Sequence, residues 1–81
     1  MTSRKRLLEK FLRNPAVVRY DQIQRLLLYF GFEMALLHGS HVKWRHKDLQ
    51  EKIVIPVHDN DCKRVYKLAV AKLIKEKFYE D

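Results

Sequence analysis

The chain has 81 residues, of which 47% are hydrophobic, and it contains only two glycines and two prolines. This size and composition suit one compact domain with a small core, and they exclude a chain that is disordered by composition. Lysine and arginine number 17 against 10 acidic residues, which gives a net charge of +7 and predicts a polyanionic partner. Charge alone does not separate RNA from DNA, an acidic protein or a membrane surface. We expect residues 1–81 to form a single domain.

The single cysteine and the N-terminal sequence predict a cytoplasmic protein. Cys62 is the single cysteine, which excludes an internal disulfide and fits a reducing compartment. The basic segment from Met1 to Arg6 is not followed by a long apolar region, so it lacks the pattern of a secretory signal peptide. The longest apolar run, from Leu26 to Phe32, is far too short to span a bilayer. We therefore expect a cytoplasmic protein without a membrane role.

A short first helix is expected over residues 4–13, with Ser3 as its cap. Four apolar side chains fall on one side of it, namely Leu7, Leu8, Phe11 and Leu12. Asn14 and Pro15 end this helix, because the residue before a proline avoids the helical conformation. Residues 15–20 then act as a connector.

A second helix is expected to begin with Asp21 as its cap. Its apolar residues recur at the i, i+3, i+4, i+7 spacing of one helical face, and they are Ile23, Leu26, Leu27 and Phe30. Gly31 follows directly, where a residue with left-handed backbone commonly closes a helix.

Three strands are expected next, over residues 32–38, 41–47 and 52–57. The first alternates imperfectly, whereas the second alternates clearly. In the second strand one face carries Val42, Trp44 and His46, and the other carries His41, Lys43 and Arg45. In the third strand Ile53, Ile55 and Val57 share a face. The short connections, a Gly39-Ser40 turn and a polar turn over residues 47–51, imply an antiparallel meander.

A last helix is expected over about residues 61–78, with Asp59, Asn60 or Asp61 as its cap. Its apolar stripe is expected to consist of Val65, Leu68, Ala69, Leu73 and Ile74. The fold class is therefore α+β, in the order α-α-β-β-β-α. A three-stranded antiparallel sheet should have helices packed on one face and a polar opposite face.

The segment around Gly39-Ser40-His41 is the strongest candidate for a chemical site. The turn delivers His41 to the start of a strand, and Lys43 and Arg45 follow on the same face. An imidazole near neutral pH can take a proton from a ribose 2′-hydroxyl or give one to a leaving oxygen. Adjacent cations can hold phosphate, and RNA supplies its own nucleophile. Spacing alone also allows His41 to be an ordinary polar strand residue.

Other readings of the same segment are weaker. Ser40 fits a turn residue better than a nucleophile, since no acid or base is paired with it. Gly39 is explained by a turn backbone with positive φ. Four histidines raise the question of a metal, but carboxylates near them are sparse and no compact ligand set stands out, so we expect none: His38, His41, His46 and His58. Trp44 fits the core, and a base-stacking platform is the alternative.

The sequence also resembles a known family. Residues 28–33 followed by Gly39-Ser40-His41 resemble the helix end and active-site turn of HicA-type toxins. Residues 53–58, leading into a basic helix, look like that family's third strand and last helix. The resemblance covers about residues 20–76. It implies a double-stranded-RNA-binding-domain-like (dsRBD-like) fold, cleavage of mRNA, and neutralisation by a HicB-type antitoxin. We expect this antitoxin to cover the positive face that carries His41, and we expect no cofactor.

The resemblance implies one catalytic histidine in this chain, and it is His41. His58 matches a frequent family position of unclear role, while Val42 stands where many members have a second histidine and Lys47 where many have proline. The helix over residues 4–13 is an addition relative to the shortest members. Ser40, Lys43 and Arg45 are the predicted RNA-binding residues.

Three functions remain open on the sequence alone. The first is a metal-independent endoribonuclease toxin with His41 as general acid or base. The second is a non-catalytic RNA-binding module of the same fold, because a fold does not determine a function. The third is a domain that binds only an acidic protein partner.

Overall fold

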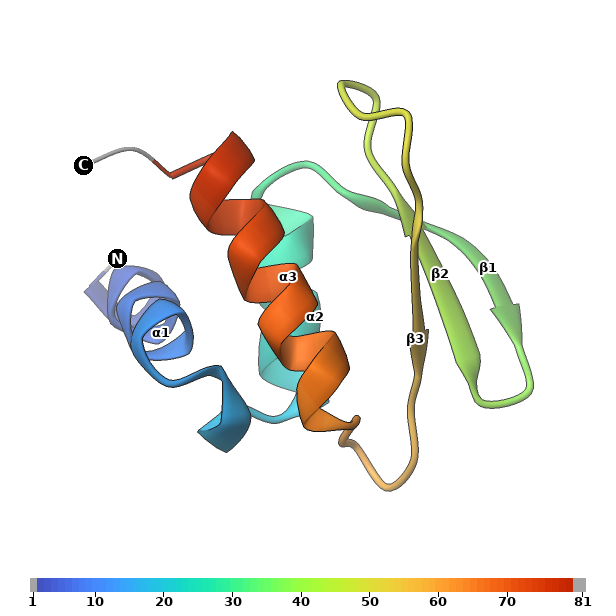
Figure 1. Cartoon of the computed structure of the whole chain (residues 1–81), viewed down its shortest axis with the longest axis horizontal. Helices are drawn as coiled ribbons and strands as arrows, with labels where there is room; N and C mark the ends of the chain where they lie inside the picture. Colours follow the sequence, from blue (N-terminus) through green and yellow to red (C-terminus); the bar gives the residue numbers. More distant parts are fainter. Residues whose placement is uncertain (1, 80–81) are drawn as a thin grey trace.

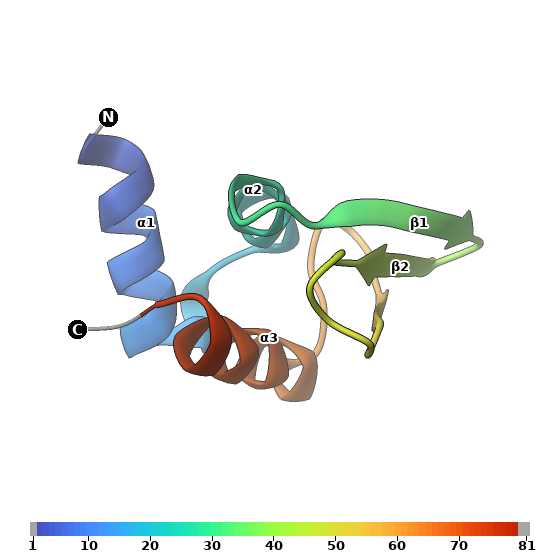
Figure 2. The ribbon, with the colours of Figure 1, turned by 90° about the horizontal axis from the view of Figure 1, so that it is seen from above.

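A computed structural model describes residues 2–79 and the side chains of residues 4–79. Its elements run in the order α1 (Thr2–Arg13), the short 3-10 helix η1 (Pro15–Val17), α2 (Tyr20–Tyr29), β1 (Glu33–His38), β2 (His41–Arg45), β3 (Ile53–Pro56) and α3 (Arg64–Lys77). The helices lie on one side of the sheet, with α1 farthest from it (Figures 1 and 2). This arrangement confirms the predicted α+β, dsRBD-like fold class. Within residues 2–79 no helix has the length and apolar character that crossing a bilayer requires.

The sheet is an antiparallel meander in the order β1-β2-β3. The register pairs Met34 with Trp44, and Trp44 in turn with Ile53, so these three residues point to the same face. A bulge interrupts β1 between Met34 and Leu36. The bulge explains why the alternation of this strand is imperfect in the sequence, because an extra residue shifts the inward and outward positions.

The core lies between this sheet face and the helices. Its largest fully buried side chains are Trp44, Phe11, Ile23, Leu26, Leu27, Ile55 and Ile74. The indole Nε1 of Trp44 donates a hydrogen bond of 3.0 Å to the hydroxyl of Tyr20, which satisfies the only polar atom of a ring with no exposed surface. The prediction of Trp44 as a core residue is confirmed, and a buried ring cannot serve as a stacking platform.

Helix α2 confirms the predicted apolar face, but its predicted cap is wrong. The helix begins at Tyr20, so Asp21 lies in its first turn rather than before it. The cap comes from a distant loop, where the side-chain Oδ1 of Asn60 accepts a 2.9 Å hydrogen bond from the Asp21 amide. Gly31 follows the helix with φ of +93°, as predicted. Helix α1 begins at Thr2, which puts Ser3 inside the helix instead of at its cap.

Helix α3 begins at Arg64, later than predicted, and none of the three acidic or amide candidates caps it. Its buried face consists of Lys67, Val70, Ala71 and Ile74. The predicted stripe is therefore wrong apart from Ile74 and the half-buried Leu73, because Val65 and Leu68 are 63% and 42% exposed. An apolar pattern leaves a lysine out, whereas Lys67 lies on the buried face because its charge finds partners inside the protein.

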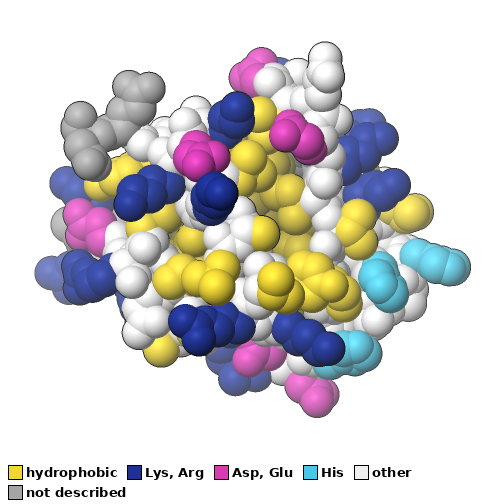
Figure 3. All heavy atoms as spheres, in the orientation of Figure 1, with side chains coloured by type: hydrophobic (Ala, Val, Ile, Leu, Met, Phe, Trp, Pro, Cys, Tyr) yellow, Lys and Arg dark blue, Asp and Glu magenta, His cyan; other side chains and the backbone are white. Residues whose placement is uncertain are grey.

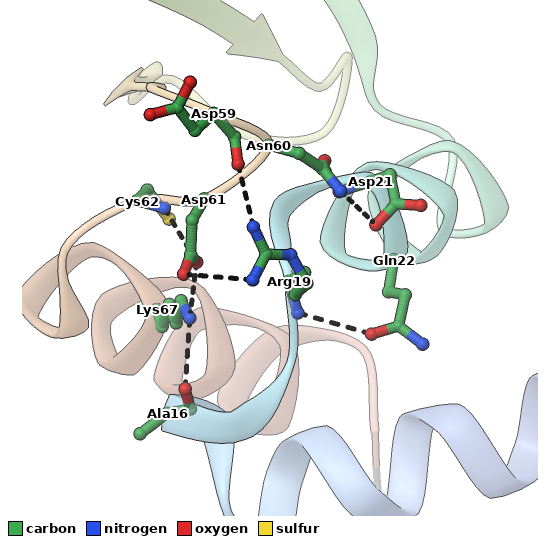
Figure 4. Close-up of polar contacts among 9 residues, drawn as sticks. All are labelled: Ala16, Arg19, Asp21, Gln22, Asp59, Asn60, Asp61, Cys62 and Lys67. Atoms are coloured by element: carbon green, nitrogen blue, oxygen red, sulfur yellow. Dashed lines mark hydrogen bonds and ion pairs between the residues drawn. The ribbon is translucent and has the colours of Figure 1, made fainter.

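These partners form a polar network that ties residues 59–61 to the helices (Figure 4). The Lys67 ammonium lies 2.7 Å from Asp61 Oδ1 and donates a 3.0 Å hydrogen bond to the Ala16 carbonyl. Arg19 donates to the Asp59 carbonyl at 2.8 Å. The hydrogen bonds from Lys67 and from the Cys62 amide lower the pKa of Asp61. The segment after β3 is thus held in place by contacts to η1, α2 and α3.

Candidate functional site

The Gly39-Ser40 turn joins β1 to β2 and presents His41 as the first residue of β2. His38 and His41 pair directly across the turn. Gly39 has φ of +61°, a conformation in which an L side chain is strained even though the space around it is open. The Ser40 carbonyl accepts a 2.6 Å hydrogen bond from the Val57 amide, which ties the turn to the end of β3.

His41, Lys43 and Arg45 lie on the outward face of β2, while Val42 and Trp44 between them are buried. His41 is exposed, and its register partners on that face are His38 in β1 and Pro56 in β3. Histidine side chains gather on the side of the molecule where the hairpin turns (Figure 3). The outward position and grouping of His41, Lys43 and Arg45 agree with the face expected from alternation.

The two cations of this face differ in their surroundings. Arg45 forms an ion pair with Glu33 at 3.4 Å, and both side chains are mostly exposed. Lys43 has Leu36 and Val54 as its cross-strand partners, and it takes part in none of the ion pairs found among residues 4–79. An anion approaching the outward face would therefore meet the unshared charge of Lys43, whereas the charge of Arg45 is already partly balanced.

The outward face is less polar than predicted. Leu36 is 53% exposed and Val54 is 43% exposed on it. Met34 and Leu37 of β1 face the helix side by register, yet they are also exposed because the helices do not reach this edge strand. The expectation of a simply polar opposite face is thus wrong. The bulge in β1 hid the positions of that strand from the alternation pattern, whereas Val54 belongs to β3 and alternates with the buried Ile55.

His46 does not belong to this site. It is buried on the opposite side of β2, where Nε2 lies 2.8 Å from the Phe30 carbonyl and Nδ1 accepts a hydrogen bond of 3.0 Å from the Asp48 amide. Its ring packs against Phe32 and Phe78. These contacts give His46 a structural role. Across the part of the chain that the structure describes, no three His, Cys, Asp or Glu side chains come together as a metal-ligand set.

A cavity of about 360 Å³ lies between the end of β3 and the start of α3. It is lined by Pro56, His58, Asp61, Cys62, Lys63 and Tyr66. The sequence analysis did not find it, because its walls come from a strand end, a loop and a helix start whose packing is a tertiary property. The one signal available was His58, which the family resemblance singled out without a role.

The order α-α-β-β-β-α, with helices on one face of a three-stranded antiparallel sheet, defines a small basic protein of the dsRBD-like class. Residues 20–75 match a family model described as HicA toxin of bacterial toxin-antitoxin. This range covers more than half of the chain, so the chain belongs to the HicA toxin family. The match begins at the first residue of α2 and leaves α1 and η1 outside it. Neither the curated proteins nor the solved structures gave a match.

Proposed function

We propose that this toxin is a metal-independent endoribonuclease that cleaves mRNA, with His41 as general acid or base. Membership of the HicA family supports a toxin whose target is RNA. The observation that carries the proposal is the exposed His41 at a turn, on one sheet face with Lys43 and Arg45. His38 lies across the turn on the same sheet face, whereas His41 belongs to the strand that carries both cations.

The chemistry needs little beyond these groups. The imidazole of His41 removes the proton of a ribose 2′-hydroxyl or protonates the leaving oxygen. Lys43 and Arg45 hold the phosphate and balance the charge that develops on it. Ser40 contacts the RNA beside the turn. Holding the 2′-oxygen in line with phosphorus supplies much of the remaining acceleration.

The partner that neutralises the toxin is proposed to be a HicB-type antitoxin that covers the His41 face. Because the toxin carries a net charge of +7, an acidic covering surface would be attracted over a distance and would speed the encounter. The exposed Leu36 and Val54 beside Lys43 add apolar area that such a partner can bury.

Induced expression of the wild type and of His41→Ala, with growth and RNA integrity followed, tests the proposal. Growth arrest with RNA loss in the wild type alone supports a His41-dependent ribonuclease. Equal arrest in both strains, or arrest in neither, would count against the enzyme. That outcome would favour a non-catalytic RNA-binding module of the same fold.

Salt dependence tests the phosphate-binding role. Lys43→Gln should weaken RNA binding and reduce the slope of log affinity against log salt by about 0.7, the value for one phosphate contact with a single strand. Arg45→Gln should have a smaller effect because Glu33 already shares its charge. Titration of labelled RNA at several salt concentrations measures both slopes. Lys10→Gln on α1 removes the same charge away from the sheet and serves as the control; an equal effect there would place RNA binding elsewhere.

Chelation tests the independence from metal. RNA cleavage should persist in excess chelator, because the RNA supplies the nucleophile and the described residues offer no ligand set. The cleavage rate is measured with and without chelator on protein freed of metal by dialysis. Activity that disappears in chelator and returns with one divalent ion would contradict the mechanism.

A further inference from the structure

We propose that the cavity between β3 and α3 binds a nucleotide of single-stranded RNA next to the phosphate at which His41 assists cleavage. The inference rests on the proposed ribonuclease function and extends it to a second subsite. It identifies Tyr66 and Lys63 as residues that position the substrate and influence which base is accepted.

The cavity is continuous with the proposed site through β3. Pro56 is a wall of the cavity and is also the cross-strand partner of His41. Neighbouring strands lie about 4.8 Å apart, so the cavity begins roughly one strand spacing from His41. On the face shown in Figure 3, hydrophobic side chains lie between α3 and the sheet, with histidine and Lys or Arg side chains beside them. A strand of RNA crossing the outward face would therefore meet this cavity at the edge of the sheet.

The walls suit a base together with its phosphate. Tyr66 packs against the core and also lines the cavity, and its ring is not paired with another aromatic ring among residues 4–79. An aromatic ring in this position offers a stacking surface for a base. Lys63 is exposed at the cavity rim and can contact phosphate, while His58 adds a polar edge. A volume of about 360 Å³ lies within the range of small-ligand sites.

Asp61 does not oppose this assignment, although it also lines the cavity. Its carboxylate is held by Lys67 at 2.7 Å and accepts a hydrogen bond of 2.9 Å from the Cys62 amide. The negative charge is therefore balanced from inside the protein, and Lys63 remains available to an anion. The same contacts hold the cavity wall in one position before any ligand arrives, which reduces the cost of ordering it on binding.

Cys62 gives a direct probe, because it lines the cavity and is the only cysteine of the chain. The probe ligand is a 2′-O-methyl RNA oligonucleotide, which binds but lacks the nucleophile for cleavage. Alkylation of Cys62 by iodoacetamide is followed by intact mass. Mildly alkaline buffer is needed, since burial raises the pKa of the thiol. At about ten times Kd the free fraction is about one tenth, so alkylation should slow about tenfold.

Variants of Tyr66 separate positioning from folding. Tyr66→Leu should lower kcat/KM for RNA cleavage about tenfold, the effect of losing one stacked base, and Tyr66→Phe should restore it. Lys63→Gln should weaken RNA binding more than Lys75→Gln, which removes the same charge from the other end of α3. Melting of each variant identifies any loss of folded protein, and the alkylation experiment on the wild type needs no substitution.

The outcomes separate the two proposals. If the wild type cleaves RNA but Cys62 reacts equally fast with the analogue bound, the subsite is overturned and the ribonuclease stands. If the analogue protects Cys62 but the wild type and His41→Ala cleave alike, the subsite stands as an RNA-binding site and the His41 mechanism is overturned. Protection by an acidic peptide and not by RNA would assign the cavity to a protein partner and also overturn the inference.

Discussion

Replacing His41 by alanine is expected to lower the rate of RNA cleavage by roughly 10² to 10⁴, the usual effect of losing one acid–base group. A slow ribonuclease would then be inactive for practical purposes. The reason is that the two cations of the outward face are proposed to bind the phosphate, whereas the imidazole of His41 is the group proposed to exchange a proton with the ribose. Single-turnover cleavage of a labelled mRNA fragment measures the loss.

The His41→Ala protein should nevertheless keep its fold. His41 is exposed at the start of β2, so its removal leaves no buried cavity and should cost at most about 1 kcal/mol in the free energy of unfolding. The variant should also still bind its antitoxin, because one side chain is a small part of the contact area. Thermal melting and co-purification check both points. A variant that melts far below the wild type would make His41 a structural residue.

His38 is the matched control for this experiment, because it lies directly across the turn on the same face. His38→Ala should retain most of the cleavage rate. If the His41→Ala protein still cleaves RNA at the wild-type rate, His41 has no catalytic role. His38 and His58 would then be the remaining histidines on that side of the molecule.

The second large effect is expected at the ion pair between the buried Lys67 and the partly exposed Asp61. Asp61→Ala should lower the free energy of unfolding by about 2 kcal/mol, because it leaves a buried ammonium with only the Ala16 carbonyl. This loss is smaller than for a fully buried pair, since the Asp61 side chain is 40% exposed and partly screened by water. In a chain of this size the melting temperature should fall by roughly 10 °C.

Lys67→Met is the informative comparison. Methionine fills much of the same space without a charge, and the exposed Asp61 can hydrate, so the loss should be only about 1 kcal/mol. Chemical denaturation of both variants measures the two values. A larger loss in Lys67→Met than in Asp61→Ala would mean that packing around the lysine stem, and not the charge, determines the stability.

The dependence on pH has a definite sign. Because the folded protein lowers the pKa of Asp61, the pair contributes fully above the ordinary aspartate pKa. Its contribution is lost as the pH falls through the lowered value. The difference in stability between the wild type and Asp61→Ala should therefore shrink in acid and remain constant near neutrality. A difference that grows in acid would contradict this account of the pair.

Local patterns in the sequence were enough to predict the strand that carries the candidate site. Alternation with a period of two separated Val42 and Trp44 from His41 and Lys43, because side chains of a strand that is buried on one side must alternate. The same reasoning identified the buried face of α2, whose apolar residues lie one helical turn apart. Gly39 and Gly31 marked a turn and a helix end, since both positions need a positive φ.

The tertiary structure alone decided which face of α3 is buried and what surrounds His41. Two faces of α3 could be buried. The one containing Lys67 is buried because its ammonium binds the carboxylate of Asp61 and the carbonyl of Ala16, which lies 51 residues earlier in the chain. Asn60 caps a helix 39 residues earlier, which no local pattern indicates. The cavity beside Pro56 likewise arises where a strand end meets a helix start. These features depend on contacts that form only in the folded protein. The periodicity of apolar residues in the sequence indicates only which face each segment could bury.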